Sequence, residues 1–551
     1  MSELITASTE YGRIKGIKTK SVLDCVYNAF LGIPYAAPPV GDLRFKAPVP
    51  PAKWEQIYDA TEEKPGCFEM NSIQKKIIGS EDCLRLNVFT KDLKPQRLQP
   101  VMVYIYGGGF QTGSNALSNL SPDYLLTAEV VVVTVNFRSG ALGFLSLQDK
   151  ELGIPGNAGL KDQRVALKFI KNNIANFGGD PDNITLFGHS SGSCLVHWHC
   201  LSEGSKNLFN RVIVMSGNIF SAAPHSNHSE WASRLATKLG YIGIKNETEI
   251  LEFLKTADPA KIIDVQTTLN QSGERTDFPF TPIMESYVTN ETFISNSWID
   301  MLRSAWSNGI DMLIGGSPDE GTVLLMEIIN DPSLHLKPEN VLPFDVNVDL
   351  DDPKVLDFIS RLKETYYDST TVEQFPLTPT TIEFTKEHLA FGKLKTDQKF
   401  WHGLQRTVQC RQNSHRNAKT YMFRFAFDSP TQNSNRNRKI GKGSTGVWHG
   451  DEINYMFKNV VALPSRDSME FKAIQKYVSM LTSFAATGDP SANLIQADMQ
   501  NIQAQPVDTL EPPFKGIFME NEPQKLQPVM VYIYGGAYKT GSCALSYDSP
   551  D

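Results

Sequence analysis

The amino-acid sequence predicts an α/β protein built on a doubly wound, mostly parallel sheet. Apolar runs at 100–106, 130–136 and 211–215 are continuous enough to be strands that are buried on both faces. Helical patterns separate such runs, and this alternation is typical of a parallel sheet covered by helices. No tract rich in proline, serine or glycine divides the chain. We therefore expect residues 1–520 to form one large domain.

The other elements follow in chain order from the spacing of apolar residues. Alternating polar and apolar residues at 11–27 favour antiparallel strands at an edge of the sheet, and the proline-rich stretch 32–39 favours a fixed loop. Further strands are predicted at 84–90, 185–187, 311–315 and 420–427. Helical spacing predicts helices at 161–177, 246–254, 259–269 and 470–486. We expect helical insertions over the carboxyl edge of the sheet, where such sheets bind ligands.

The end of the chain copies an earlier segment. Residues 523–551 repeat 95–123 at a constant offset, with Ala537 in place of the last glycine of the triplet 107–109. The chain stops inside the copy, and a single strand cannot bury a core of its own. We interpret 521–551 as a partial duplicate and not an independent domain. A truncated tandem duplication and a fused gene model remain as its two explanations, and we slightly favour the second.

Composition excludes several classes of function. A net charge of -8 without a basic stripe argues against nucleic acid as a partner. The first twenty residues hold no apolar run of signal length, and the chain has no stretch long enough to be a transmembrane segment, so we expect a cytoplasmic protein. Among the 7 cysteines, only Cys67 and Cys83 are separated by a short loop. They could form a disulfide, although reduced thiols are the default expectation in the cytosol.

The strongest chemical signal is the pentapeptide Gly188-His189-Ser190-Ser191-Gly192. It follows a short apolar strand and precedes a helical pattern, which is the setting of a nucleophile elbow. A serine hydroxyl is a weak nucleophile and must stand where a base can reach it. The five-residue pattern alone is also compatible with an ordinary strand-to-helix turn.

A histidine and an acid would complete such a site. In the chain order of this kind of site the acid follows the serine and the histidine comes last. His449 follows the glycine-rich loop 441–446, whereas His388 and His402 lie in helical patterns. His449 is therefore the candidate base. The alternative interpretation of His449 is a residue beside a helix N-terminus that has no catalytic role.

Two neighbouring carboxylates could supply the acid. Asp319 and Glu320 come just after the strand 311–315, on the edge where Ser190 is expected. Spacing alone does not separate the two, and either could be a solvated turn residue. The glycines 107–109 after a buried strand would let backbone N–H groups approach an oxyanion, with the N–H of Ser191 as a further donor.

These motifs, in this order, resemble those of the type-B carboxylesterase/cholinesterase family. Within that family the chain looks most similar to the insect intracellular α-esterases. The resemblance runs from about residue 10 to residue 520. It is carried by GIPYAAPPVGDLRF (32–45), SEDCLRLNV (80–88), YIYGGGF (104–110), NFRSGALGFLS (136–146), GNAGLKDQ (156–163), FGHSSG (187–192), MSGN (215–218), SPDEG (317–321) and VWHGDE (447–452).

The resemblance implies an α/β-hydrolase fold and a set of site residues. The set is the triad Ser190, Glu320 and His449, the oxyanion hole of Gly108, Gly109 and Ser191, and Ser216 as a supporting residue. It also implies the structural ion pairs Arg44–Glu81 and Arg138–Asp162. Ser191 stands where the family usually has alanine. Ala223 stands where many relatives carry tryptophan, which predicts a roomier acyl pocket.

The activity that the resemblance implies is hydrolysis of a small-molecule carboxylic ester through an acyl-enzyme on Ser190, without a metal or an organic cofactor. Xenobiotic or lipid-type esters are the expected substrates, and detoxification is one expected role. A non-catalytic cholinesterase-like protein that acts in binding or adhesion is the alternative from another class, although such proteins usually lack the serine or the histidine. A lipase that works at lipid interfaces is the nearer alternative.

Overall fold

The computed structural model describes residues 3–71, 75–221, 229–244, 246–269, 279–325, 351–366, 386–414, 418–429, 446–459, 461–491 and 517–520. They belong to two compact units. The first unit comprises Met1–Val214, Ala222–Ser307 and Ile453–Leu494, and the second comprises Met215–Ser221, Asn308–Glu452 and Ile495–Asp551. The partial duplicate at 521–551, the acyl-pocket position Ala223 and nearly all of the loop 441–446 lie outside the described residues. A single domain over 1–520 therefore stays a prediction.

The first unit is organised around a sheet whose central strands are parallel. In spatial order its strands are β1 (Leu4–Thr9), β2 (Gly12–Lys20), β3 (Val26–Pro34), β7 (Arg85–Thr90), β9 (Val131–Val135), β8 (Gln99–Ile105), β10 (Gly179–His189) and β11 (Arg211–Met215). Neighbours from β1 to β9 pair antiparallel, whereas β9, β8 and β10 pair parallel. The predicted antiparallel edge and buried central strands are confirmed.

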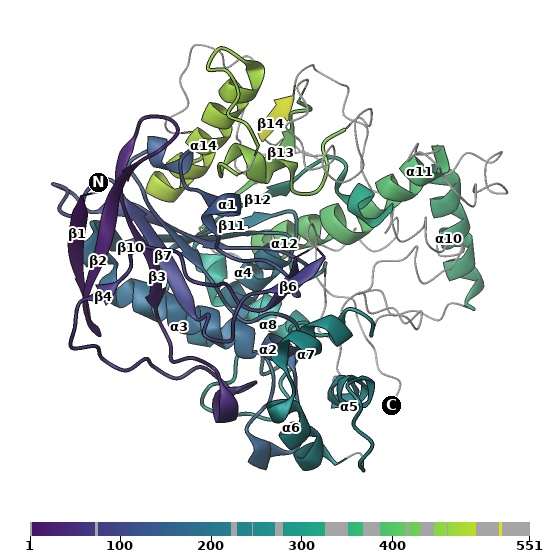
Figure 1. The fold of residues 1–551 in the computed structure, drawn as a ribbon. Helices are drawn as coiled ribbons and strands as arrows, with labels where there is room; N and C mark the ends of the chain where they lie inside the picture. The colour runs from purple at the N-terminus through teal and green to yellow at the C-terminus, as the bar shows by residue number, and fades with distance from the viewer. Residues whose placement is uncertain are drawn as a thin grey trace. The chain divides into compact units, whose positions relative to one another are not determined.

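Short strands and several helices complete this unit. The strands are β4 (Tyr58–Asp59), which pairs with β2, and the hairpin of β5 (Glu69–Asn71) and β6 (Lys76–Ile78). The helices are α1 (Leu117–Leu120), α2 (Gly140–Phe144), α3 (Ala158–Asn173), α4 (Ser191–Leu201), α5 (Ser229–Lys238), α6 (Glu247–Thr256), α7 (Pro259–Gln266), α8 (Trp298–Ser304) and α14 (Met469–Thr487). Helices α3 and α14 lie on opposite sides of the strands (Figure 1), as expected for a doubly wound sheet.

Local sequence explains where these elements begin and end. The strand β9 is VVVTV and is buried along its whole length, which suits β-branched side chains in a central strand. In α14 the apolar residues recur three or four positions apart, so they form one face toward the core. Ser468 caps its N-terminus by accepting from Phe471 N–H, and Gly488 ends it with a φ of 79°.

Several predicted boundaries differ from the structure by one or more residues, and three of them are instructive. The strand predicted at 185–187 begins at Gly179, because the polar residues 180–183 extend it beyond its buried part. The predicted helix 161–177 starts at Ala158 and ends in a 3-10 turn. The stretch 32–39, which was predicted as a loop, contributes its first three residues to β3, which ends at Pro34.

Two ion pairs that the family resemblance implies are formed in the first unit. Arg138 binds Asp162 through Nε and Nη2 at 2.8 and 2.6 Å, and both side chains are buried. Arg44 binds Glu81 in the same two-pronged way, and its remaining nitrogen donates to three carbonyl groups at the end of α6, those of Leu254, Lys255 and Ala257. These planar, charge-assisted contacts connect segments that are far apart in the sequence.

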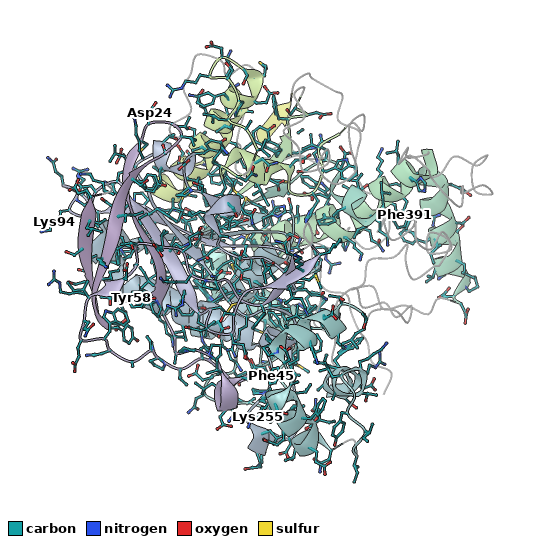
Figure 2. The ribbon with its side chains drawn as sticks, viewed as in Figure 1. Asp24, Phe45, Tyr58, Lys94, Lys255 and Phe391 are labelled. Carbon is teal, nitrogen blue, oxygen red and sulfur yellow. A yellow bond between two sulfur atoms is a disulfide. The ribbon has the colours of Figure 1, made fainter. Side chains whose placement is uncertain are left out.

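The second unit holds a parallel set of strands and a helical layer. Its strands are β12 (Asp311–Gly316), β13 (Thr420–Ala426) and β14 (Ile517–Glu520). Its helices are α10 (Pro353–Tyr366), α11 (Lys386–Lys395) and α12 (His402–Gln412), with the π-helical turn η10 (Thr396–Trp401) joining the last two. Phe391, labelled on α11 in Figure 2, packs in a buried cluster with Leu325, Ile359, Leu362 and Leu394.

Together these elements confirm the predicted fold class, a mixed sheet with parallel central strands and helices around it. Among the described residues, no helix combines the length and the apolar character that crossing a membrane requires.

Candidate active site

The first unit positions Ser190 on a sharp turn between β10 and α4. Ser190 has a φ of 58° and a ψ of -130°, a backbone conformation that residues other than glycine rarely adopt. The two flanking glycines allow the turn to pack against β8. A Cβ on Gly192 would lie 2.3 Å from the carbonyl oxygen of Ile105, and one on Gly188 would lie 2.7 Å from the backbone of Gly192. The predicted strand, turn and helix of a nucleophile elbow are therefore present.

The glycine loop after β8 lies directly against this turn. A Cβ on Gly107 would be 2.9 Å from the Cβ of Ser190, which places the loop beside the proposed nucleophile. Gly108 and Gly109 have φ values of 144° and 63°, in the region that favours glycine. The N–H of Gly108 donates to Ser191 Oγ at 3.0 Å. The structure thus brings together Ser190, Ser191 and the glycines that the sequence predicted as an oxyanion hole.

A buried carboxylate that the sequence analysis missed supports this loop. Glu69 accepts a hydrogen bond from the N–H of Gly113, and burial raises the pKa of its carboxyl group. Glu69 follows Cys67, whose sulfur is bonded to that of Cys83. The expectation of two reduced thiols thus differs from the structure, because folding holds the two Cα atoms 4.9 Å apart.

The second unit pairs the predicted histidine with one of the two predicted acids. His449 Nδ1 lies 2.6 Å from Glu320 Oε2. The Glu320 side chain is fully buried, and the N–H of Ser317 donates to its other oxygen at 2.7 Å. With Nδ1–H directed at the carboxylate, Nε2 is the nitrogen that can accept a proton.

Asp319 has a different role from Glu320. Its carboxylate accepts from the N–H of Val447 at 3.0 Å, and its backbone N–H donates to the carbonyl of Val447. Gly446 makes this contact possible, because a Cβ there would lie 2.5 Å from the Asp319 carboxylate. Asp319 therefore holds the segment that leads to His449, while Glu320 binds the imidazole.

Ser216, which the resemblance implied as a supporting residue, binds a second buried carboxylate. Its hydroxyl donates to Glu452 Oε1 at 2.6 Å, and Ser317 Oγ lies 3.4 Å from Glu452 Oε2. Both Ser216 and Glu452 are fully buried. The sequence analysis missed Glu452, although it ends the VWHGDE motif three residues after His449.

The π-helical turn η10 packs against His449 and against the turn that carries Glu320, and no sequence pattern predicted it. The Thr396 hydroxyl accepts from the N–H of Gly321 at 2.7 Å, and the Trp401 indole donates to the carbonyl of Ser317 at 2.9 Å. The ring of Phe400 lies 5.0 Å from that of His449. A widened turn of this kind inside a helix often marks a functional site.

Asp397 on η10 is a buried carboxyl group whose effect on stability can be tested. Burial raises its pKa to about 6, an effect opposed by the hydrogen bond from Tyr366 OH at 2.6 Å and by the charges of Lys393 and Arg424. Because the pKa is raised in the folded state, ionisation of the Asp397 carboxyl group lowers the free energy of unfolding. The protein is therefore most stable with Asp397 neutral, at low pH, and this stability is lost as the pH rises from 3.8 through about 6.

Replacing Asp397 by asparagine keeps the shape and removes the charge. We expect the variant to be more stable to unfolding by about 3 kcal/mol at pH 7.5, and by only about 1 kcal/mol at pH 4.5. Urea midpoints of the two proteins at these pH values measure the difference. A stabilisation that does not shrink toward pH 4.5 contradicts the assignment to this carboxyl group.

Comparison with known proteins shows which proteins the whole chain is similar to. A model of the carboxylesterase family matches residues 3–512. Esterase B1 of Culex pipiens is 37% identical over 528 residues, which cover 94% of this chain and 95% of that protein. Juvenile hormone esterase of Tribolium castaneum is 29% identical, over 88% of this chain and 83% of that protein.

A solved structure extends the likeness to the fold. The crystal structure of juvenile hormone esterase from Manduca sexta, with OTFP covalently attached, matches with a TM-score of 0.79 at 26% identity and covers 95% of this chain and 96% of that one. The family model and Esterase B1 both extend over nearly the whole chain. The chain therefore belongs to the carboxylesterase family, has the α/β-hydrolase fold and is a carboxylic ester hydrolase.

Proposed function

We propose that this esterase works through an acyl-enzyme on Ser190, with His449 as general base and acid and Glu320 as the residue that orients the imidazole. The observation that carries the proposal is the 2.6 Å contact between His449 and a fully buried Glu320. Such a contact fixes the tautomer that a base for serine needs. The strained backbone of Ser190 supports the other half of the proposal.

In this mechanism Ser190 Oγ attacks the ester carbonyl carbon while its proton passes to Nε2 of His449. The carbonyl electrons move onto oxygen, and the N–H groups of Gly108, Gly109 and Ser191 stabilise the resulting oxyanion. The alcohol then leaves with the proton from His449. Water, deprotonated by the same imidazole, attacks the acyl-enzyme, and the bond between the acyl carbon and Ser190 Oγ breaks as His449 returns the proton to that oxygen, which releases the acid. These steps need no metal and no organic cofactor.

We further propose xenobiotic or lipid-type esters as the substrates, and detoxification as one role. The relatives of the chain support this range, because they include a juvenile hormone esterase and a venom carboxylesterase. Initial rates on a panel of aryl, short-chain and long-chain esters would rank these classes. Saturation without activation at an emulsion surface would count against a lipase.

Covalent labelling tests the nucleophile directly. After exposure to paraoxon, we expect the intact mass to rise by one diethylphosphoryl group and peptide mapping to place it on the peptide that contains Ser190, because phosphorylation requires an activated serine and a working oxyanion hole. Folding of the sample is checked by circular dichroism. A folded protein that takes up no phosphoryl group, or takes it up on another residue, contradicts the proposal.

A further inference from the structure

One proposed oxyanion donor already has a partner in the resting structure. The N–H of Gly108 donates to the hydroxyl of Ser191 at 3.0 Å, which is an ordinary hydrogen-bond length. Ser191 is the residue next to Ser190 and its side chain is buried. A backbone N–H is directional and makes one strong hydrogen bond at a time. While it donates to Ser191 Oγ, it is not fully available to the substrate.

The backbone member of this hydrogen bond is held in place. A Cβ on Gly108 would lie 2.1 Å from the carbonyl oxygen of Thr112, so the loop passes very close to itself here. Thr112 also donates from its N–H and its hydroxyl to the carbonyl of Gly108, at 3.0 and 3.1 Å. These contacts keep the Gly108 N–H aimed in one direction.

The side-chain member of the hydrogen bond can move. Ser191 is the first residue of α4, so its backbone is fixed by the helix while its χ1 angle can change between staggered positions. Rotation about χ1 would withdraw Oγ and leave the Gly108 N–H to the oxyanion. The N–H of Ser191 itself would stay where it is, because it belongs to the backbone.

We propose that the Ser191 hydroxyl is a movable cap on the oxyanion hole, bound to Gly108 N–H at rest and displaced when the oxyanion forms. The inference rests on the proposed function of Ser190 and of these donors. Ser191 acts through the Gly108 N–H, so it is a positioning residue that tunes the reactivity of the site. The charge-assisted bond to the oxyanion is stronger than the neutral one that it replaces, so the cap slows the reaction without preventing it.

The expected size follows from the bond that must be broken. A neutral hydrogen bond of this kind contributes on the order of 1 kcal/mol net, so its removal corresponds to about fivefold in rate. Oxyanion donors are aimed at the position of the oxyanion and not at that of the ground-state carbonyl oxygen. The effect should therefore appear in kcat and leave KM nearly unchanged.

The test compares Ser191→Ala with wild type, using a trifluoromethyl ketone as the probe. A serine nucleophile adds to such a ketone and forms a hemiketal whose oxyanion occupies the hole. For Ser191→Ala we expect about fivefold tighter binding of the ketone and about fivefold higher kcat on an aryl ester, with KM within twofold. Ser193→Ala is the matched control, because Ser193 is a buried serine on the same helix, and it should leave all three constants unchanged.

The outcomes separate the two proposals. Unchanged or weaker ketone binding by a folded Ser191→Ala protein overturns the cap, and a lower kcat would indicate that the hydroxyl donates to the oxyanion instead. Ketone binding by the wild-type protein that is lost in Ser190→Ala supports the proposed function whatever Ser191→Ala does. A folded wild-type protein that forms no hemiketal overturns both proposals. Equal melting temperatures of wild type and variants establish that folding is unchanged.

Discussion

Replacing Ser190 by alanine is expected to lower kcat for an aryl ester by at least about 10⁴-fold, because acyl transfer then has no nucleophile. The variant should retain substrate binding, since the hydrogen bond between Gly108 and Ser191 and the contact between Glu320 and His449 are formed by other residues. Initial rates at saturating ester, measured on freshly purified variant protein, give the ratio.

The Ser193→Ala variant is the control for this experiment, because it removes a buried hydroxyl from the helix that follows Ser190. Its kcat should stay within twofold of wild type. If Ser190→Ala kept more than a tenth of the wild-type rate in a sample free of wild-type contamination, the nucleophile would have to be sought elsewhere.

Replacing Glu320 by glutamine is expected to lower kcat by about 10⁴-fold while KM changes little. The carboxylate that accepts from His449 Nδ1–H becomes an amide, whose NH2 group favours the opposite tautomer of the imidazole. Nε2 then carries the proton and cannot accept one from Ser190. Steady-state kinetics across pH 6 to 9 measure the fall in kcat and show whether kcat of the variant still depends on pH.

Asp319→Asn is the matched control, since it makes the same change in the neighbouring residue. Asparagine can still accept from the N–H of Val447, so the loop before His449 keeps its anchor and kcat should fall less than about tenfold. Equal losses in the two variants would mean that orientation of His449 does not depend on Glu320 in particular.

The central sheet could be predicted from the sequence because a strand that is buried on both faces consists mostly of apolar residues. Runs such as 101–105 and 131–135 are apolar apart from Thr134, and they became the central strands β8 and β9. Boundaries were less certain where polar residues continue a strand, as they do in β10 before Ile184. The hydrogen bonds that extend a strand depend on the neighbouring strand, which the local sequence does not contain.

The sequence predicted which residue types form the site and their order in the chain. It did not predict which of these residues contact one another. Asp319 and Glu320 are adjacent carboxylates on one turn, and only the packing of that turn decides which one meets His449. Glu69 and Glu452 were missed for the same reason. Nothing in the local pattern distinguishes a carboxylate that will be buried beside N–H or hydroxyl donors from one that will face water.

The close packing of the elbow also bears on how such a chain can change over generations. Its two glycines leave no space for a Cβ, so a substitution at Gly188 or Gly192 would rebuild the turn. Between them, Ser190 is committed to chemistry in the proposed mechanism, which leaves His189 and Ser191 as the positions open to exchange. Selection for resistance to a poison, or for a new ester, would therefore act most readily through these two immediate neighbours of the nucleophile. This tightly constrained turn would then also offer a short mutational route to altered reactivity.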